Sequence, residues 1–308
     1  MSDSSPLVYL IIVNYNSSEH SIELLNSIKR LTYPHKKTII LDNCSTDNSL
    51  RKITSHLNNE SVVKFDLSVN TFTAESITNT DFCLVKSDKN GGYACGNNLV
   101  LQSILKENAF VWLLNPDTTV ENDSLSHLIE TSSQNPSAIY TTSIKSEGSD
   151  DIRSGLCYIN KWLGTTHHIT EKKKRKFADY IYGASLFTHL QVFRTVGLFP
   201  EDYFLYWEET KWCMHASRLN IPFVWCKKAL IYDKVSSLGN NKSYLSEYYF
   251  SLNALRFFSV YHPFYFPFVV FANAARIIYR FLQGNSLRSK AILKATAHYF
   301  SKKIIFRG

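Results

Sequence analysis

Several features that mark common protein classes are missing from this sequence of 308 residues. The six cysteines form no CxxC pair and have no metal-like spacing with histidine, which disfavours a cysteine-based metal site. The N-terminal segment has no basic region followed by a long apolar run. We therefore expect no signal peptide, and cysteines that stay reduced in the cytosol. With 19% charged and 44% hydrophobic residues, the chain is not disordered and has enough apolar surface for a core.

Acidic residues are missing from the C-terminal fifth of the chain. Residues 248–308 contain nine Lys or Arg and no Asp or Glu. The whole chain has 34 basic and 26 acidic residues, which leaves 25 and 26 for residues 1–247. This asymmetry predicts an anionic partner for the tail, either lipid headgroups or nucleic acid.

Strand-like and helix-like segments alternate along the first part of the chain. Residues 7–16 form a near-continuous apolar run, which is typical of a strand covered on both faces in a parallel sheet. Residues 17–31 have apolar side chains at helical spacing, residues 36–43 predict a second strand, and residues 44–57 a second helix. Strand and helix in this order predict a doubly wound α/β unit.

The segments that follow are less uniform. We interpret residues 59–82 as an inserted hairpin, and the basic run at 171–176 as a solvated loop or an aid to membrane contact. Between them we expect a strand, a glycine-rich turn and a helix start at 81–98, a strand at 110–117, a helix at 124–134 and a strand at 137–145.

Polar residues follow several of the expected strands, at the point where each strand ends. They are Asn14 and Asn16, Asp42 and Asn43, and Asn115 and Asp117. In an open parallel sheet, ligands bind beyond the carboxyl ends of the strands. Any one of these residues has a turn or cap role as its alternative, but their recurrence at one edge favours a binding site.

The glycine-rich segment "NGGYACGNN" places glycines where the backbone must approach something closely or take a positive φ. The segment is in register with neither GxGxxG nor GxxxxGK[ST]. Dinucleotide-binding and P-loop interpretations therefore lose support.

A set of motifs occurs in a fixed order along the chain: "VYLIIVNYNSSEHSIELLNSI", "IILDNCSTDNS", "NGGYACGNN", "LLNPDT" and "GASLFTHLQVFRTVGLFPEDYFLYWEETKWCMHA". Together they resemble the inverting family 2 glycosyltransferases of GT-A fold, most closely the bacterial rhamnosyltransferase-like branch. The resemblance covers most of residues 7–260. It implies an α/β GT-A domain at 1–245, with a nucleotide-sugar half at about 1–118 and an acceptor half at about 119–245. A basic, aromatic helical region at 246–308 follows.

The resemblance also implies a divalent cation, Mg²⁺ or Mn²⁺, that stabilises the departing diphosphate. Asp117 matches the metal-binding acid, and Asn115 stands where the family often has a first Asp. Asp233 stands where the family often has a histidine ligand. It either replaces that histidine, or the metal is bound more loosely. An Asx-turn after Pro116 is the alternative for Asp117.

Nucleotide contacts are implied at the preceding strand ends. Asp42 is expected to accept a hydrogen bond from the imide N–H of a uracil or thymine base, or to bind the ribose. Asn14 and Asn16 are expected to line the same base pocket. The site also includes Asp88 and the turn Asn90-Gly91-Gly92, which are expected to approach the ribose and the diphosphate. Capping and turn roles are the alternatives.

The segment "YWEETKW" supplies the acid/base candidates. Inversion by single displacement needs one general base near the acceptor hydroxyl. By resemblance the base is Glu209, with Glu208 as its neighbour, and a solvated helix start is the alternative. Tyr206 and Trp207 are suited to stacking on an acceptor sugar, with core packing as the alternative. The altered segment "FPED" leaves Glu201 or Asp202 near the acceptor.

The tail contains a stretch at 257–275 without Asp, Glu, Lys or Arg, but its prolines argue against a simple transmembrane helix. We predict helices lying in the interface, with a basic face on anionic lipid. A helical pair packed on the catalytic domain or a homodimer contact is the alternative. Aromatic residues clustered with prolines favour lipid over nucleic acid.

The sequence thus predicts an inverting, metal-dependent glycosyltransferase, located in the cytoplasm at the inner face of the cell membrane. We expect it to transfer rhamnose from dTDP-rhamnose to a lipid-linked glycan acceptor in surface polysaccharide synthesis. A UDP-hexose or UDP-N-acetylhexosamine donor is one alternative. Because Asn115, Glu209 and Asp233 depart from the family pattern, an inactive membrane-bound scaffold is another.

Overall fold

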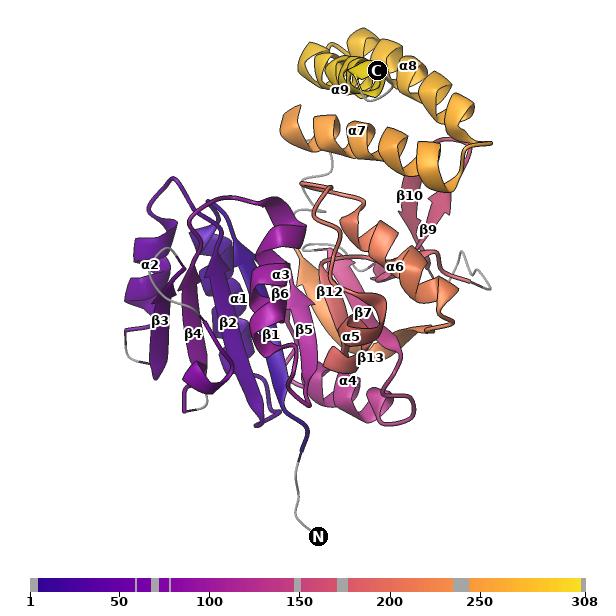
Figure 1. Cartoon of the computed structure of the whole chain (residues 1–308). Helices are drawn as coiled ribbons and strands as arrows, with labels where there is room; N and C mark the ends of the chain where they lie inside the picture. The colour runs from indigo at the N-terminus through magenta and orange to yellow at the C-terminus, as the bar shows by residue number, and fades with distance from the viewer. Residues whose placement is uncertain are drawn as a thin grey trace.

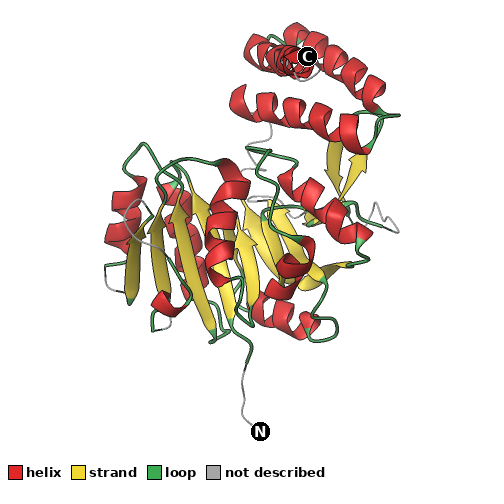
Figure 2. Ribbon diagram, in the orientation of Figure 1, coloured by secondary structure: helices red, strands yellow, loops and turns green. Residues whose placement is uncertain are grey.

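A computed structural model describes residues 5–58, 60–67, 72–77, 79–146, 151–170, 177–234 and 244–305. It consists of a large sheet flanked by helices, with three C-terminal helices stacked above it (Figures 1 and 2). The basic run at 171–176 lies outside the described residues, so our interpretation of it stays a prediction.

The main sheet has the order β3-β4-β2-β1-β5-β12-β7-β13-β6, with β8 paired to β7. Its strands are β1 (Val8–Asn14), β2 (Lys36–Asp42), β3 (Val62–Asp66), β4 (Phe82–Lys86), β5 (Phe110–Leu114), β6 (Thr118–Val120), β7 (Ile139–Ser146), β8 (Ile152–Ser154), β12 (Ser185–His189) and β13 (Phe223–Asp233). A small second sheet contains β9 (Leu156–Asn160), β10 (Thr165–His168) and β11 (Tyr180–Ile181).

The strands on the N-terminal side of the sheet are parallel. β1 lies between β2 and β5 and runs parallel to both, and β4 runs parallel to β2 and β3. The carboxyl ends of these strands therefore meet at one edge, as the sequence predicted. The expected hairpin at 59–82 is wrong, because β3 pairs in parallel with β4 and extends the sheet by one edge strand.

Helices cover both faces of the sheet (Figure 1). They are α1 (Ser18–Lys29), α2 (Ser49–His56), α3 (Gly92–Ile104), α4 (Ser124–Ser132), α5 (Leu190–Val196) and α6 (Glu208–Arg218), with a short 3₁₀ turn η1 (Glu75–Ile77). Successive residues of β1 and β5 belong to opposite hydrophobic clusters: Ile11 and Leu113 to one, Ile12 and Leu114 to the other. Burial on both faces explains why these strands have continuous apolar runs.

The C-terminal region forms three helices, α7 (Tyr244–Tyr261), α8 (Phe266–Leu282) and α9 (Ser286–Ile305). α9 packs against both α7 and α8. A buried ion pair joins Arg288 of α9 to Glu247 of α7. Within the described residues, no helix is both long and apolar enough to cross a membrane.

Candidate active site

A hydrogen-bonded network joins the ends of β1 and β2. Asn14 is fully buried, and its Nδ2 donates to Asp42 Oδ1 at 2.9 Å, while its Oδ1 accepts from Ser21 Oγ at 2.8 Å. Asp42 also accepts from Ser45 Oγ at 2.6 Å and from the Ser45 backbone N–H at 3.0 Å. Asn14 thus fixes the orientation of Asp42; Oδ1 accepts two hydrogen bonds, whereas Oδ2 accepts one and keeps a lone pair for a ligand.

Asn16 ties the loop after β1 to the loop after β2. Its backbone is left-handed, with φ 50°, which asparagine tolerates better than most residues. Its Oδ1 accepts from the Thr46 backbone N–H at 2.8 Å, and its Nδ2 donates to Thr46 Oγ1 at 3.0 Å. Asn16 is exposed, so its side chain lies at the surface beside the Asp42 network.

The glycine-rich turn contacts the loop that precedes α6. Asn90 Oδ1 accepts from the Gly92 backbone N–H at 3.0 Å and from Asn43 Nδ2 at 3.1 Å. Gly92 has φ 85°, and a Cβ there would lie 2.0 Å from the Phe204 carbonyl oxygen. No other residue type fits this position without a backbone shift. Gly91 is the N-cap of α3.

Not every residue of the predicted nucleotide site is held in this way. Asp88 is exposed in the loop between β4 and α3. Asn115 begins a turn: its carbonyl accepts from the Thr118 backbone N–H at 3.2 Å and from Thr118 Oγ1 at 2.7 Å. The turn between β5 and β6 places Asp117 beyond the end of the sheet.

Asp117 and Asp233 lie at neighbouring positions. Asp233 is the last residue of β13 and pairs across the strands with Thr118 of β6. Burial, and then the negative charge of Asp233, raise the pKa of Asp117 to about 6, while His20 of α1 opposes the shift. The two carboxylates are therefore close enough to repel each other. A cation between them would relieve that repulsion.

Arg153 completes this group, and no motif in the sequence pointed to it. Asp233 is 2% exposed, and Arg153 Nη2 donates to its Oδ2 at 3.1 Å. The Nε atom of Arg153 is buried and makes no hydrogen bond with the described residues. In the described part of the chain, no three or more His, Cys, Asp or Glu side chains are grouped for metal binding. Protein ligands to a cation would therefore be few, which suits an ion that keeps water or phosphate oxygens.

Glu208 and Glu209 form the first turn of α6. The two preceding residues, Tyr206 and Trp207, have φ of 65° and 75°, a left-handed conformation that is costly for large side chains. Burial, and then the charge of Glu209, raise the pKa of Glu208 well above its usual value. Burial raises the pKa of Glu209 to about 7. The Oε2 atom of each carboxyl is buried and has no hydrogen-bond partner among the described residues.

Glu209 lies where α3 and the loop before β12 meet α6. Tyr93 of α3 donates its hydroxyl to the Gly183 carbonyl oxygen at 2.9 Å. A Cβ on Gly183 would lie 3.8 Å from Glu209 Cδ, so this glycine borders the carboxyl group. A carboxyl group with a pKa near neutrality can accept a proton from a hydroxyl group and still release it.

The structure corrects one acceptor assignment. Trp207 is 2% exposed, its Nε1 donates to the Phe250 carbonyl oxygen at 3.1 Å, and its ring packs on Phe257 at 5.0 Å. The alternative of core packing is therefore the correct one for Trp207, and its ring does not face an acceptor. Tyr206 is only partly buried and packs edge-on against Phe250.

The two other acceptor candidates lie in the exposed loop before α6. Glu201 Oε1 accepts from Asn98 Nδ2 at 2.9 Å, and Asp202 forms an ion pair with Lys211 at 2.9 Å. Their place near a bound acceptor stays a prediction.

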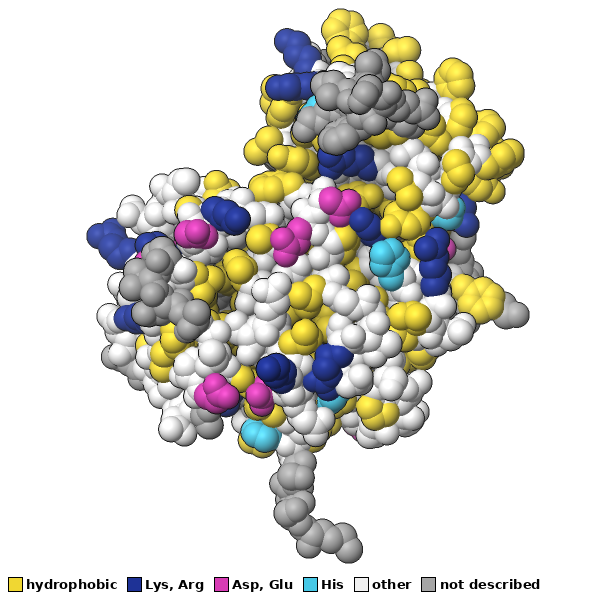
Figure 3. All heavy atoms as spheres, in the orientation of Figure 1, with side chains coloured by type: hydrophobic (Ala, Val, Ile, Leu, Met, Phe, Trp, Pro, Cys, Tyr) yellow, Lys and Arg dark blue, Asp and Glu magenta, His cyan; other side chains and the backbone are white. Residues whose placement is uncertain are grey.

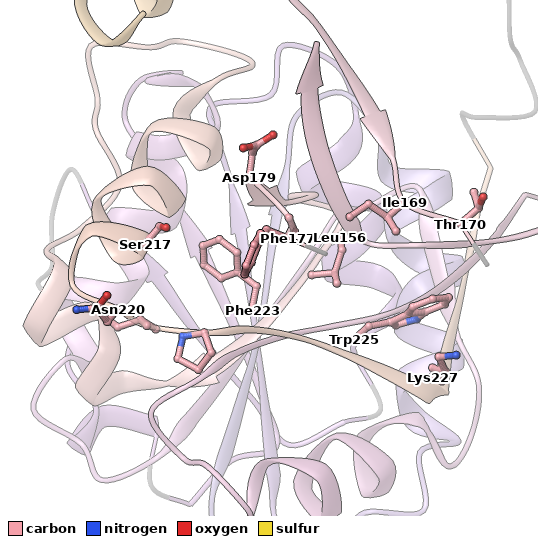
Figure 4. A pocket seen from close by; sticks show the side chains of 13 residues that line it. Leu156, Ile169, Thr170, Phe177, Asp179, Ser217, Asn220, Phe223, Trp225 and Lys227 are labelled. Carbon is pink, nitrogen blue, oxygen red and sulfur yellow. The ribbon is translucent and has the colours of Figure 1, made fainter. Parts of the chain in front are cut away.

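A separate hollow of about 750 Å³ lies away from all these residues, between the start of β13, the end of α6 and β9 (Figure 4). Its lining includes Leu156, Asp179, Phe223, Trp225 and Lys227. None of the residues that the sequence assigned to a site lines it.

The mostly parallel sheet, its polar strand ends and the helices on both faces define an α/β protein of GT-A fold. Residues 9–195 match the sequence profile described as "Glycosyl transferase family 2", and the chain belongs to that family. It is 26% identical over 226 residues to the low-salt glycan biosynthesis hexosyltransferase Agl10 of Haloferax volcanii. This match covers 71% of the present chain and 64% of the relative, so the chain spans less than two thirds of that relative's length.

Solved structures share the fold at low sequence identity. The mannosyltransferase PcManGT from Pyrobaculum calidifontis, in complex with GDP-Man and Mn²⁺, is 12% identical with a TM-score of 0.56; the match covers 98% of this chain and 90% of that one. GalNAc-T7 with UDP, GalNAc and Mn²⁺ is 11% identical with a TM-score of 0.57, over 76% and 45% of the two chains. S. aureus TarS 1-349 is 16% identical with a TM-score of 0.53, over 96% and 91%.

Proposed function

We propose that the protein transfers a sugar from a nucleoside diphosphate donor to a glycan acceptor. The observation that carries this proposal is the pair of desolvated carboxylates, Asp117 and Asp233, at the ligand-binding edge of the sheet in a member of glycosyl transferase family 2. The buried carboxyl pair at the start of α6 supplies a candidate base in the same chain.

A divalent cation, Mg²⁺ or Mn²⁺, fits the first pair. Asp117 and Asp233 would hold it through carboxylate oxygens, and it would neutralise the charge that develops on the departing diphosphate. The Mn²⁺ in the complexes of PcManGT and GalNAc-T7 supports this assignment. Arg153, whose buried Nε has no described partner, is a second source of positive charge at this place.

The nucleotide would bind across the ends of β1 and β2. Asp42 would accept the imide N–H of a pyrimidine base, because Asn14 and Ser45 hold its carboxylate as an acceptor. Asn16 would line the base pocket, and Asp88 and the turn at Asn90 would approach the ribose and diphosphate.

The proposed transfer is a single displacement with inversion. Glu209 removes the proton of the acceptor hydroxyl, whose oxygen attacks the anomeric carbon of the donor as the bond to the diphosphate breaks. The nucleoside diphosphate leaves with the bonding electron pair. Burial, and then the charge of Glu209, raise the pKa of Glu208, which favours its neutral form and would limit the negative charge beside Glu209.

For the donor we propose dTDP-rhamnose, with UDP-hexose and UDP-N-acetylhexosamine as the competing donors of the same class. The hexosyltransferase relative and the UDP complex of GalNAc-T7 support testing these competitors side by side. For the acceptor we propose a lipid-linked glycan at the inner face of the cell membrane, in surface polysaccharide synthesis.

The test combines binding and turnover. Thermal unfolding would be measured with each sugar nucleotide, with and without Mn²⁺, because a tight ligand raises stability. Release of nucleoside diphosphate would be measured for wild type, Asp117→Asn and the surface control Asp123→Asn. We expect one pyrimidine donor to stabilise the protein and only Asp117→Asn to lose Mn²⁺-dependent turnover. If no donor is turned over and Asp117→Asn changes nothing, the chain is a scaffold and not an enzyme.

A further inference from the structure

Helix α8 turns its polar side chains toward the protein. Asn273 is fully buried, and Arg276 Nη2 donates to its Oδ1 at 2.7 Å and to the Leu163 carbonyl oxygen at 3.2 Å. Arg280 lies 3.8 Å from the buried carboxylate of Glu247. The basic face that the sequence assigned to lipid is, in this helix, the inner face.

The opposite side of α8 is apolar and exposed. Phe271 is 72% exposed, Ile278 61% and Leu282 78%. These positions recur at helical spacing and share one face. We define the α8 face as Phe264, Phe268, Phe271, Ile278, Tyr279, Phe281 and Leu282, all of which are exposed. Hydrophobic side chains crowd this part of the molecule in Figure 3, over the C-terminal helices at the upper right. An apolar patch of this extent marks an interaction site.

The β9–β10 hairpin extends the α8 face. Trp162 and Leu163 at its tip are 52% and 50% exposed, and the Trp162 ring lies 4.7 Å from the Phe268 ring. Gly164 has φ 60°, and a Cβ there would lie 2.6 Å from a methyl group of Val269. The hairpin therefore sits tightly on α8, and a segment distant in sequence adds two large apolar side chains to the surface.

We propose that the α8 face and the hairpin tip form a docking surface for an anionic lipid bilayer, with α8 lying in the plane of the interface. Aromatic side chains are favoured at the boundary between headgroups and acyl chains. α9, which packs against α8, exposes Lys290 and Lys294, and residues 248–308 contain no acidic residue. Cations on the helix that packs against the apolar one match the negative surface potential of anionic lipid.

The same charges argue against a second copy of the chain as the occupant. In a two-fold dimer the same patch of each copy faces the other. The α8 faces of the two copies would then be in contact, and the α9 helix of each copy would lie next to that contact. Lys290 and Lys294 of one copy would then approach basic residues of the other, without an acidic residue from this region to pair with. A bilayer supplies the missing negative charge.

This docking does not depend on the proposed function, because it is measured without donor or turnover. It would, however, bring a glycosyltransferase to acceptors that are anchored in lipid.

The test is flotation of the full chain with vesicles of phosphatidylcholine, alone or mixed equally with phosphatidylglycerol. The face variant is Phe271→Ser with Ile278→Ser, and the control is Leu219→Ser, which changes a 51% exposed leucine at the end of α6. We expect wild type and control to float with the mixed vesicles. The face variant should bind at least about tenfold more weakly, because each lost side chain removes apolar burial.

Charge is tested separately. Lys290→Gln with Lys294→Gln should weaken binding to mixed vesicles several-fold and make it less sensitive to salt. Light scattering after size exclusion reports the oligomeric state of each variant. The proposal is overturned if wild type does not float with mixed vesicles, or if the face variant floats as well as the control. It is also overturned if wild type is a dimer, the face variant is a monomer, and neither protein binds to vesicles.

Discussion

Replacing Arg153 with glutamine should destabilise the protein, and Mn²⁺ should restore much of the loss. The Asp233 side chain is 3% exposed and lies 3.1 Å from Arg153 Nη2. Removing one partner of a buried ion pair costs about 3–5 kcal/mol, because the other charge is left unpaired. The Arg153 side chain is 24% exposed, so water screens part of the interaction and we expect about 2 kcal/mol.

Thermal unfolding is the assay. A loss of about 2 kcal/mol lowers the Tm of a chain of 308 residues by roughly 3 °C. In the variant Asp233 no longer pairs with Arg153, so a cation held by Asp117 and Asp233 would face less competition for the carboxylate. Mn²⁺ at about 100 times its Kd contributes about 2.7 kcal/mol. In wild type the cation must displace Arg153 from Asp233, so the shift in Tm on adding Mn²⁺ should be smaller.

Two further variants complete the comparison. Asp233→Asn in the Arg153→Gln background removes the buried negative charge that Arg153 no longer offsets, and it should recover stability without Mn²⁺, a coupling that a double-mutant cycle measures. Arg194→Gln is the matched control, because within the described residues the hydrogen bonds of this arginine go to Gln191 Oε1 and to the carbonyl oxygens of Leu105 and Glu107. If Mn²⁺ raises the Tm of wild type and Arg153→Gln equally, Asp233 does not contact the cation and the reasoning is refuted.

The other predictions concern the acid/base helix and its support. The pKa of Glu209 is raised to about 7 from 4.5, so the folded protein should lose stability as pH rises through this interval. The difference in Tm between pH 5.5 and pH 8 should therefore be smaller in Glu209→Gln than in wild type. An unchanged difference would contradict the assignment. Transfer by wild type should rise as pH increases through about 7, and Glu209→Gln should lower kcat by about 10²–10⁴ while nucleotide binding persists in calorimetry. Gly92→Ala should lower stability by more than about 2 kcal/mol in denaturant titration, because its Cβ would overlap the Phe204 carbonyl oxygen. Trp207→Ala should cost about 3–5 kcal/mol through the cavity it leaves, and a change below about 1 kcal/mol would show that the ring is not a core residue.

Local patterns predicted the sheet because both faces of its strands are covered. Continuous apolar runs such as β1 and β5 follow from that burial, and the polar residue after each run marks the end of the strand. The parallel order of the strands then brings these ends to one edge, which is why Asp42 and Asp117 could be proposed before the structure was known.

Long-range pairing could not be predicted in this way. Arg153 reaches Asp233 because β7 pairs with β8 on one side and with β13 on the other, and no spacing in the sequence encodes that arrangement. Trp207 is buried by α7, which lies far along the chain. For α8, the composition of the tail predicted an interfacial helix with its basic face on lipid, but the inward direction of its arginines depends on Glu247 and on the hairpin.

The contact between the glycine-rich turn and the loop before α6 has a kinetic consequence. The Tyr93 backbone N–H donates to the Phe204 carbonyl oxygen at 3.2 Å, next to the position where Gly92 leaves no space. A donor that shifts this turn must also shift Phe204, and with it the start of the helix that bears Glu209. In the proposed reaction, the rate at which an acceptor binds near Glu209 should therefore depend on whether the sugar nucleotide is already bound.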